Sequence, residues 1–128
     1  MYDETPTYRP PLTGYCGRYS HHRAIVERLP DRTRLSPAWS RTLQTHSRAF
    51  EWGYAGSGPS QLALAILLDY TREERLALDH YRAFTREVIA GFDGEWHLTT
   101  EQINQELTAL GARVPTDRPR PSPERLDG

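Results

Sequence analysis

The sequence contains no lysine, so all sixteen of its basic residues are arginines. Seventeen acidic residues nearly balance them, and the formal net charge of -1 excludes a strong general attraction to nucleic acid or anionic membranes. A GC-rich coding sequence explains this composition. The alternative is an arginine surface selected to grip phosphate or carboxylate groups through bidentate hydrogen bonds. The charge balance favours the compositional explanation.

Cysteine is nearly absent, and long apolar runs are lacking. The single cysteine, Cys16, excludes an intramolecular disulfide and a zinc site built from several cysteines. The longest apolar run, residues 62–68, is too short to span a bilayer. The N-terminus is acidic and proline-rich, unlike a secretory signal peptide. These absences predict a cytoplasmic protein without membrane association.

The length of 128 residues fits a single domain with one modest core. We expect residues 1–12, which contain three prolines, to form a flexible arm. Residues 13–112 are expected to form the globular domain. Residues 113–128 are rich in proline and charge, which predicts a disordered tail because little apolar surface can offset the entropy of ordering.

The most informative segment is residues 50–71, which read FEWGYAGSGPSQLALAILLDYT. An aromatic cluster runs into a glycine-rich turn, and a helix predicted over residues 59–70 follows. That helix is apolar on nearly every side, which is typical of a helix buried at the centre of a fold. Pro59 suits its first position, after an N-cap at Gly58 or Ser57, and Gln61 is placed to reach back to the cap.

Local signals predict the remaining helices. Thr71 and Glu74 have the spacing of a capping box, which predicts a second helix over residues 72–90. Gly91 is expected to end that helix in a left-handed conformation. Residues 31–49 contain one further apolar stretch, which indicates irregular structure or a short helix.

Three short segments predict strands, over residues 12–18, 23–29 and 95–98. A second capping box at Thr99 and Gln102 starts a last amphipathic helix, which Gly111 ends. The order of the elements indicates a small single-domain α+β fold. In this fold a short antiparallel sheet packs on a buried central helix, with two further helices.

The run FEWGY at residues 50–54 and the run GSGPSQLALA at residues 56–65 resemble the family known as domain of unknown function 6166. Further matching pieces are Tyr15 with Gly17 and Arg18, Tyr81 with Phe84, and Phe92 and Asp93 with Glu95 and Trp96. The resemblance covers about residues 15–107. Members of this family occur in bacteria, archaea, phages and plasmids and have no established activity. The resemblance therefore implies a link to mobile elements or host defence and leaves the chemistry open.

The glycine-rich turn is the first candidate site. A helix N-terminus presents free N–H groups and a partial positive charge, so Gly56, Ser57 and Gly58 could hold an anion or nucleotide. Trp52 and Tyr54 could stack on its ring if they are exposed. The structural alternative is favoured in both cases. In that alternative the glycines serve close packing, and the aromatic residues, with Trp96, belong to the core.

The second candidate site is the arginine-rich stretch of residues 18–48, where only two acidic residues oppose the basic ones. A nucleic-acid interface is expected there if the protein has one. Its arginines are Arg18, Arg23, Arg28, Arg32, Arg34, Arg41 and Arg48.

No catalytic residue, metal site or cofactor is predicted. The five histidines show no metal-binding spacing, and neither Cys16 nor Ser57 has the context of an activated nucleophile. We therefore expect a non-enzymatic accessory protein that binds another protein. Nucleic-acid binding through residues 18–48 and anion binding at the glycine-rich turn are the alternatives.

Overall fold

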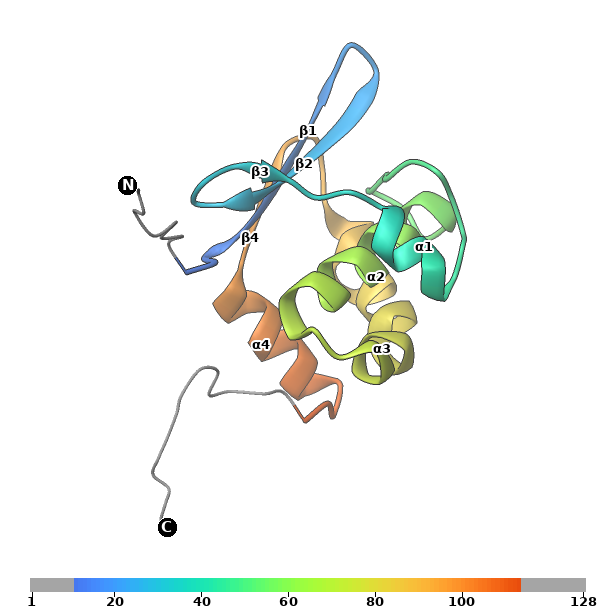
Figure 1. The fold of residues 1–128 in the computed structure, drawn as a ribbon, viewed down its shortest axis with the longest axis vertical. Coiled ribbons are helices and arrows are strands. Elements are labelled where there is room, and N and C mark those ends of the chain that lie inside the picture. Colours follow the sequence, from blue (N-terminus) through green and yellow to red (C-terminus); the bar gives the residue numbers. More distant parts are fainter. Residues whose placement is uncertain (1–10, 114–128) are drawn as a thin grey trace, which may run out of the picture.

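The structure, a computed structural model, describes residues 11–113. Four strands form one antiparallel sheet in the order β3-β2-β1-β4. The strands are β1 Gly14–Ser20, β2 Arg23–Leu29, β3 Thr33–Arg34 and β4 Trp96–Thr99. The helices are α1 Ala38–Leu43, α2 Ser57–Thr71, α3 Glu74–Glu87, α4 Thr100–Ala109 and the short 3-10 helix η1 Ile89–Gly91. The predicted α+β fold is confirmed (Figure 1).

Strands β1 and β2 form a hairpin that projects beyond the rest of the molecule (Figure 1). Ser20 pairs with Arg23, so only His21 and His22 make the turn. Both histidines have positive φ, 51° and 65°. A two-residue turn with this backbone twist matches the twist of the flanking strands and fixes their register.

The sheet has one buried face and one polar face, because successive side chains of a strand point to opposite sides. The buried face packs against the helices and carries Tyr15, Val26, Trp96 and Leu98. On the other face Cys16 lies between its cross-strand neighbours Glu27 and His97.

Helix α2 lies at the centre of the fold and packs against α1, α3 and η1. Its residues 61–68 are each at most 3% exposed, so the predicted burial on all sides is confirmed. A fully buried leucine or isoleucine stabilises the fold by roughly 2 kcal/mol. This one helix therefore supplies a large part of the hydrophobic stabilisation.

The start of α2 differs from the prediction. The helix begins at Ser57 with Gly56 as its N-cap, so Pro59 lies inside the first turn. Gln61 does not reach back to the cap, because its fully buried amide bonds to residues 40–47 instead. Its Oε1 accepts hydrogen bonds from the backbone N–H groups of His46 and Ser47, at 2.7 and 3.1 Å.

The Nε2 of Gln61 completes this buried network. It donates to the hydroxyl of Ser40 at 2.9 Å and to the carbonyl of Gln44 at 3.2 Å. The amide thus anchors the end of α1 and the segment that follows it. Four satisfied bonds explain why a polar side chain is tolerated at the centre of the core.

The capping box predicted at Thr71 and Glu74 is wrong. The hydroxyl of Thr71 donates back to the carbonyl of Leu67 at 2.7 Å and accepts from the N–H of Glu73 at 3.1 Å. Helix α2 therefore continues to Thr71, and Arg72 ends it in the left-handed conformation with φ 59°. Helix α3 begins only at Glu74, and it ends at Glu87 rather than at residue 90.

The C-terminal elements agree better with the sequence. The capping box of Thr99 and Gln102 is present at the start of α4, and Gly111 has the positive φ of a helix stop. Gly91 was expected to be left-handed, which is wrong, because it ends η1 without a positive φ. Segment 31–49 holds both β3 and α1. The predicted arm and tail fall almost entirely outside the described residues and stay predictions.

Candidate functional site

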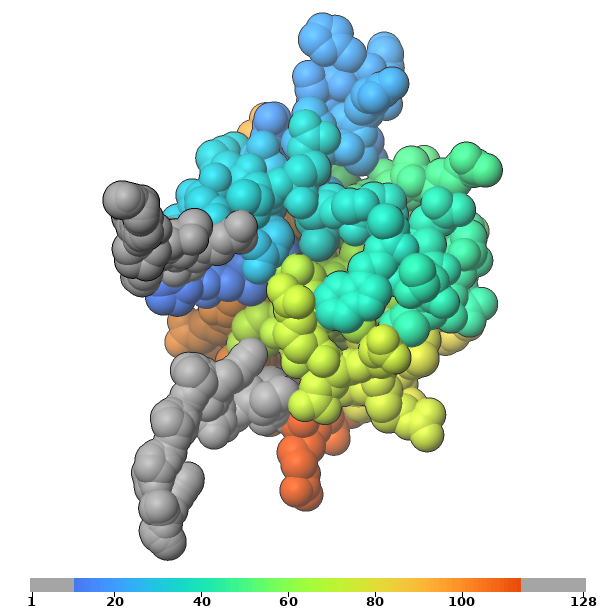
Figure 2. Space-filling view, viewed as in Figure 1, coloured from blue at the N-terminus to red at the C-terminus, as the bar shows by residue number. Residues whose placement is uncertain are grey.

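A groove lies between the projecting hairpin and the chain around residues 48–51, and we call it the hairpin groove. Its volume is about 490 Å³. Figure 2 shows the notch that separates the hairpin from this segment, drawn in green. The floor is formed by the buried side chains of Val26, Leu35 and Phe50. The groove thus has an apolar floor, and its walls come from different parts of the chain.

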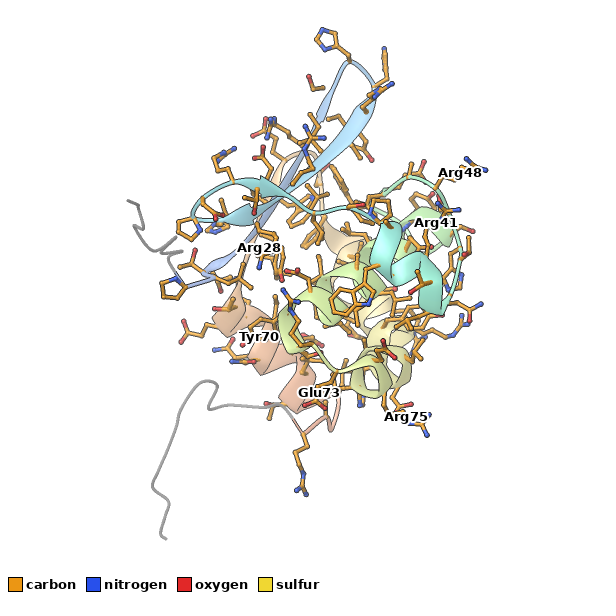
Figure 3. The ribbon with its side chains drawn as sticks, viewed as in Figure 1. Arg28, Arg41, Arg48, Tyr70, Glu73 and Arg75 are labelled. Carbon is orange, nitrogen blue, oxygen red and sulfur yellow. The ribbon has the colours of Figure 1, made fainter. Side chains whose placement is uncertain are left out.

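Three arginines and one acidic residue, Glu51, line the hairpin groove. Arg23, Arg34 and Arg48 line it and are exposed, and His22 joins them at the turn. None of the three guanidinium groups has a hydrogen bond or ion pair within residues 11–113. Arg48 lies at the edge of the molecule (Figure 3). These three cations are therefore available to an anionic ligand.

Tyr19 adds an aromatic surface to the groove. One side of its ring packs against Trp52, with ring centroids 4.4 Å apart, and 48% of the residue remains exposed. Burial and the nearby charge of Glu51 raise the pKa of its phenol, so Tyr19 stays neutral. A neutral, half-exposed ring that packs against Trp52 on one side is suited to stacking on a flat ligand with the other.

Trp52 is buried, as the core interpretation predicted, and its Nε1 donates to the carbonyl of Gly94 at 2.8 Å. It also packs edge-on against Trp96, whose ring stacks on Phe92. Tyr54 is 48% exposed, so its assignment to the core is wrong. Tyr54 stays at the surface because its hydroxyl donates a hydrogen bond to the carboxylate of Glu51 there.

The glycine-rich turn carries a carboxylate of its own. Gly58 is buried, and a Cβ atom at this position would lie 2.5 Å from the Oε1 of Glu51. The negative charge of Glu51 therefore sits against the positive end of α2, where an external anion would bind. Gly56 lies beneath the ring of Tyr54. Anion binding at Gly56, Ser57 and Gly58 stays a prediction, and such an anion would have to displace Glu51.

Other arginines of the 18–48 stretch have acidic partners. Arg18 and Arg32 each lie 3.0 Å from Glu27 on the polar face of the sheet. Burial alone would raise the pKa of Glu27. The hydrogen bond from Arg18 and the charges of Arg18, Arg32 and Arg34 outweigh burial and lower this pKa. The carboxylate is consequently ionised and neutralises part of this face.

Arg28 points to the opposite side, between the sheet and the helices (Figure 3). Its Nε donates to Asp69 of α2 at 2.9 Å. Burial alone would lower the pKa of Arg28. The hydrogen bond to Asp69 and the charge of Asp69 outweigh burial, so the pKa is raised. Arg41 lies half-buried on α1. The structure therefore brings together Arg23, Arg34 and Arg48 and places the other four predicted arginines elsewhere.

No group of three or more histidine, cysteine, aspartate or glutamate side chains in residues 11–113 is arranged to hold a metal ion. Within the same residues, no helix combines the length and apolar character of a membrane span. Tyr19 and His22 are groove residues that sequence reasoning missed. The available signal was an aromatic residue next to the polar residues Ser20, His21 and His22, which are typical of a turn.

Sequence comparison assigns the chain to a family. The profile of the family described as "Family of unknown function (DUF6166)" matches residues 15–109. The chain belongs to this family. The DUF6166 match covers every strand and helix named above, apart from the first residue of β1. No curated protein and no solved structure matches the chain.

Proposed function

We propose that this DUF6166 protein is a binding protein and that its hairpin groove binds single-stranded nucleic acid. The observation that carries the proposal is the convergence of one half-exposed tyrosine and three arginines on a single groove, where these arginines form no hydrogen bond or ion pair within residues 11–113. Cations that follow a backbone, beside an aromatic ring that stacks on a base, are the usual elements of single-strand recognition. A base paired within a duplex offers no free face to Tyr19.

Fluorescence anisotropy with a labelled single-stranded oligonucleotide tests the proposal. We expect binding at low salt and a loss of affinity as salt rises. For single strands the logarithm of affinity falls with the logarithm of salt by about 0.7 per phosphate contact, so three contacts give a slope of about 2. Replacing Arg23, Arg34 and Arg48 by glutamine should abolish most of this slope.

The matched control changes three exposed arginines of α3, Arg75, Arg82 and Arg86, to glutamine. It alters the net charge equally but leaves the groove intact. Tyr19→Ala should weaken binding by about tenfold with an unchanged salt slope, because stacking is not ionic. The proposal fails if no oligonucleotide binds at low salt, or if the α3 control loses as much affinity as the groove variant.

The sequence ranked a protein partner first and nucleic acid second, and the groove supports the opposite order for this surface. Absence of enzymatic activity, the cytoplasmic location and the link to phages or plasmids stay predictions.

A further inference from the structure

We infer that a second groove, at the free edge of β4, binds an extended peptide that carries basic side chains. Strand β4 ends the sheet order β3-β2-β1-β4, and no strand of residues 11–113 pairs with its outer side. Beside it lies a groove of about 490 Å³, which we call the edge groove. Its walls come from the C-terminal end of α3, from η1 and from α4.

The backbone of His97 faces the open side of β4. Hydrogen-bonded and non-bonded pairs alternate along an antiparallel ladder. The N–H of Leu35 donates to Val26, which orients β2 towards β3 at this residue, and the alternation carries through β1 to β4. The N–H of Thr99 is already bonded to the side chain of Gln102. His97 therefore offers the free N–H and carbonyl to which an added strand can bond.

The edge groove also has apolar and acidic parts. Val88, Phe92 and Leu98 give it apolar surface, and Phe92 is held by its stack on Trp96. Its two charged acidic residues, Glu87 and Glu106, have no ion pair within the described chain, and no arginine lines it.

The C-terminal end of α3 adds to the negative potential that Glu87 and Glu106 create in the edge groove. Glu87 is the last residue of the helix, where the partial charge of the helix dipole is also negative. Charge complementarity therefore selects a basic partner over an acidic one. Apolar residues of such a peptide would pack on Phe92 and Leu98, while its basic residues face Glu87 and Glu106.

The test uses an amide-capped nonapeptide in which arginine alternates with valine, titrated into the full-length protein labelled with nitrogen-15. We expect saturable binding with a shift of the His97 amide resonance. A peptide with glutamate in place of arginine should bind at least about tenfold more weakly. Double replacement by arginine at Glu87 and Glu106 should invert this preference.

The control variant replaces Glu74 and Glu101, two exposed acids outside the groove, by arginine. It should keep the preference of the unmodified protein. The inference is overturned if the His97 amide does not move, or if the charge-reversed variant still prefers the arginine peptide. A well-dispersed spectrum of each variant verifies the fold independently of binding. Oligonucleotide affinity should be unaffected by the peptide, so this test and that of the hairpin groove fail separately.

Discussion

The hydroxyl of Tyr15 donates a 2.6 Å hydrogen bond to the carboxylate of Asp69 and so joins the inner strand β1 to the central helix α2. Arg28 donates to the same carboxylate oxygen from β2. The side chain of Asp69 is only 11% exposed, and Arg72 lies 3.8 Å from its other carboxylate oxygen. Burial, together with the charge and hydrogen bond of Asp69, raises the pKa of Tyr15 and keeps it a donor.

Removing one donor should cost less than removing the acceptor. We expect Tyr15→Phe to lower the free energy of unfolding by about 2 kcal/mol, because one bond to a charged group is lost. Asp69→Ala should lower it by about 3 kcal/mol, because Arg28 and Tyr15 both lose their partner. Urea denaturation measures both values. Equal losses would contradict the shared role of Asp69.

Gln61 should be the most sensitive polar residue of the core. Gln61→Leu keeps the side-chain size but leaves the half-buried N–H groups of His46 and Ser47 without their acceptor. We expect a loss of about 3 kcal/mol in the free energy of unfolding. Gln105→Leu on the exposed side of α4 serves as the control and should change stability by less than about 0.5 kcal/mol. A similar effect of both substitutions would contradict the proposed network.

Two glycines should respond oppositely to alanine. A Cβ atom at Gly17 would collide with the indole ring of Trp96, so Gly17→Ala should destabilise the fold by about 2 kcal/mol. Around Gly91 the space is open and φ is not positive. Gly91→Ala should therefore be neutral or stabilise by about 0.5 kcal/mol. Thermal unfolding of the two variants checks the contrast, and the same sign for both would refute it.

Stability should fall in mild acid because of His46. Its Nε2 lies 2.6 Å from the hydroxyl of Tyr81, and burial, with the charge of Arg82, lowers its pKa from the ordinary 6.5. Below about pH 6.5 the unfolded chain binds this proton more readily than the folded one. The stabilising contribution is thus complete above that pH and declines as the pH falls towards the folded-state pKa.

Urea midpoints at about pH 8 and about pH 5.5 measure this dependence. His46→Gln should flatten it, since glutamine does not titrate in this range. An unchanged difference between the two pH values in the variant would assign the effect to other groups.

The features that the sequence predicted well are those encoded locally. Helix α2 is apolar on all sides, so its burial required no knowledge of its neighbours. The cap of α4 depends only on Thr99 and Gln102. The same spacing gave a wrong prediction at Thr71, because its hydroxyl bonds back to Leu67 and the preceding helix continues by one residue.

The parts that could not be predicted depend on long-range contacts. The partners of Gln61 lie fourteen to twenty-one residues away in the sequence. The arginines of residues 18–48 were recognised as a set, but their separation into groups depends on strand register. Side chains alternate between the two faces of a strand, so Arg28 points inward to Asp69, whereas Arg18 faces Glu27 on the outer side.

The buried amide of Gln61 also has a consequence for the hairpin groove. It fixes the backbone at His46 and Ser47, directly before Arg48, so this wall is held in place by the hydrophobic core. A preorganised wall sacrifices little conformational entropy when it receives a ligand. Recognition at this surface would accordingly proceed as a lock-and-key encounter rather than by induced fit of the loop.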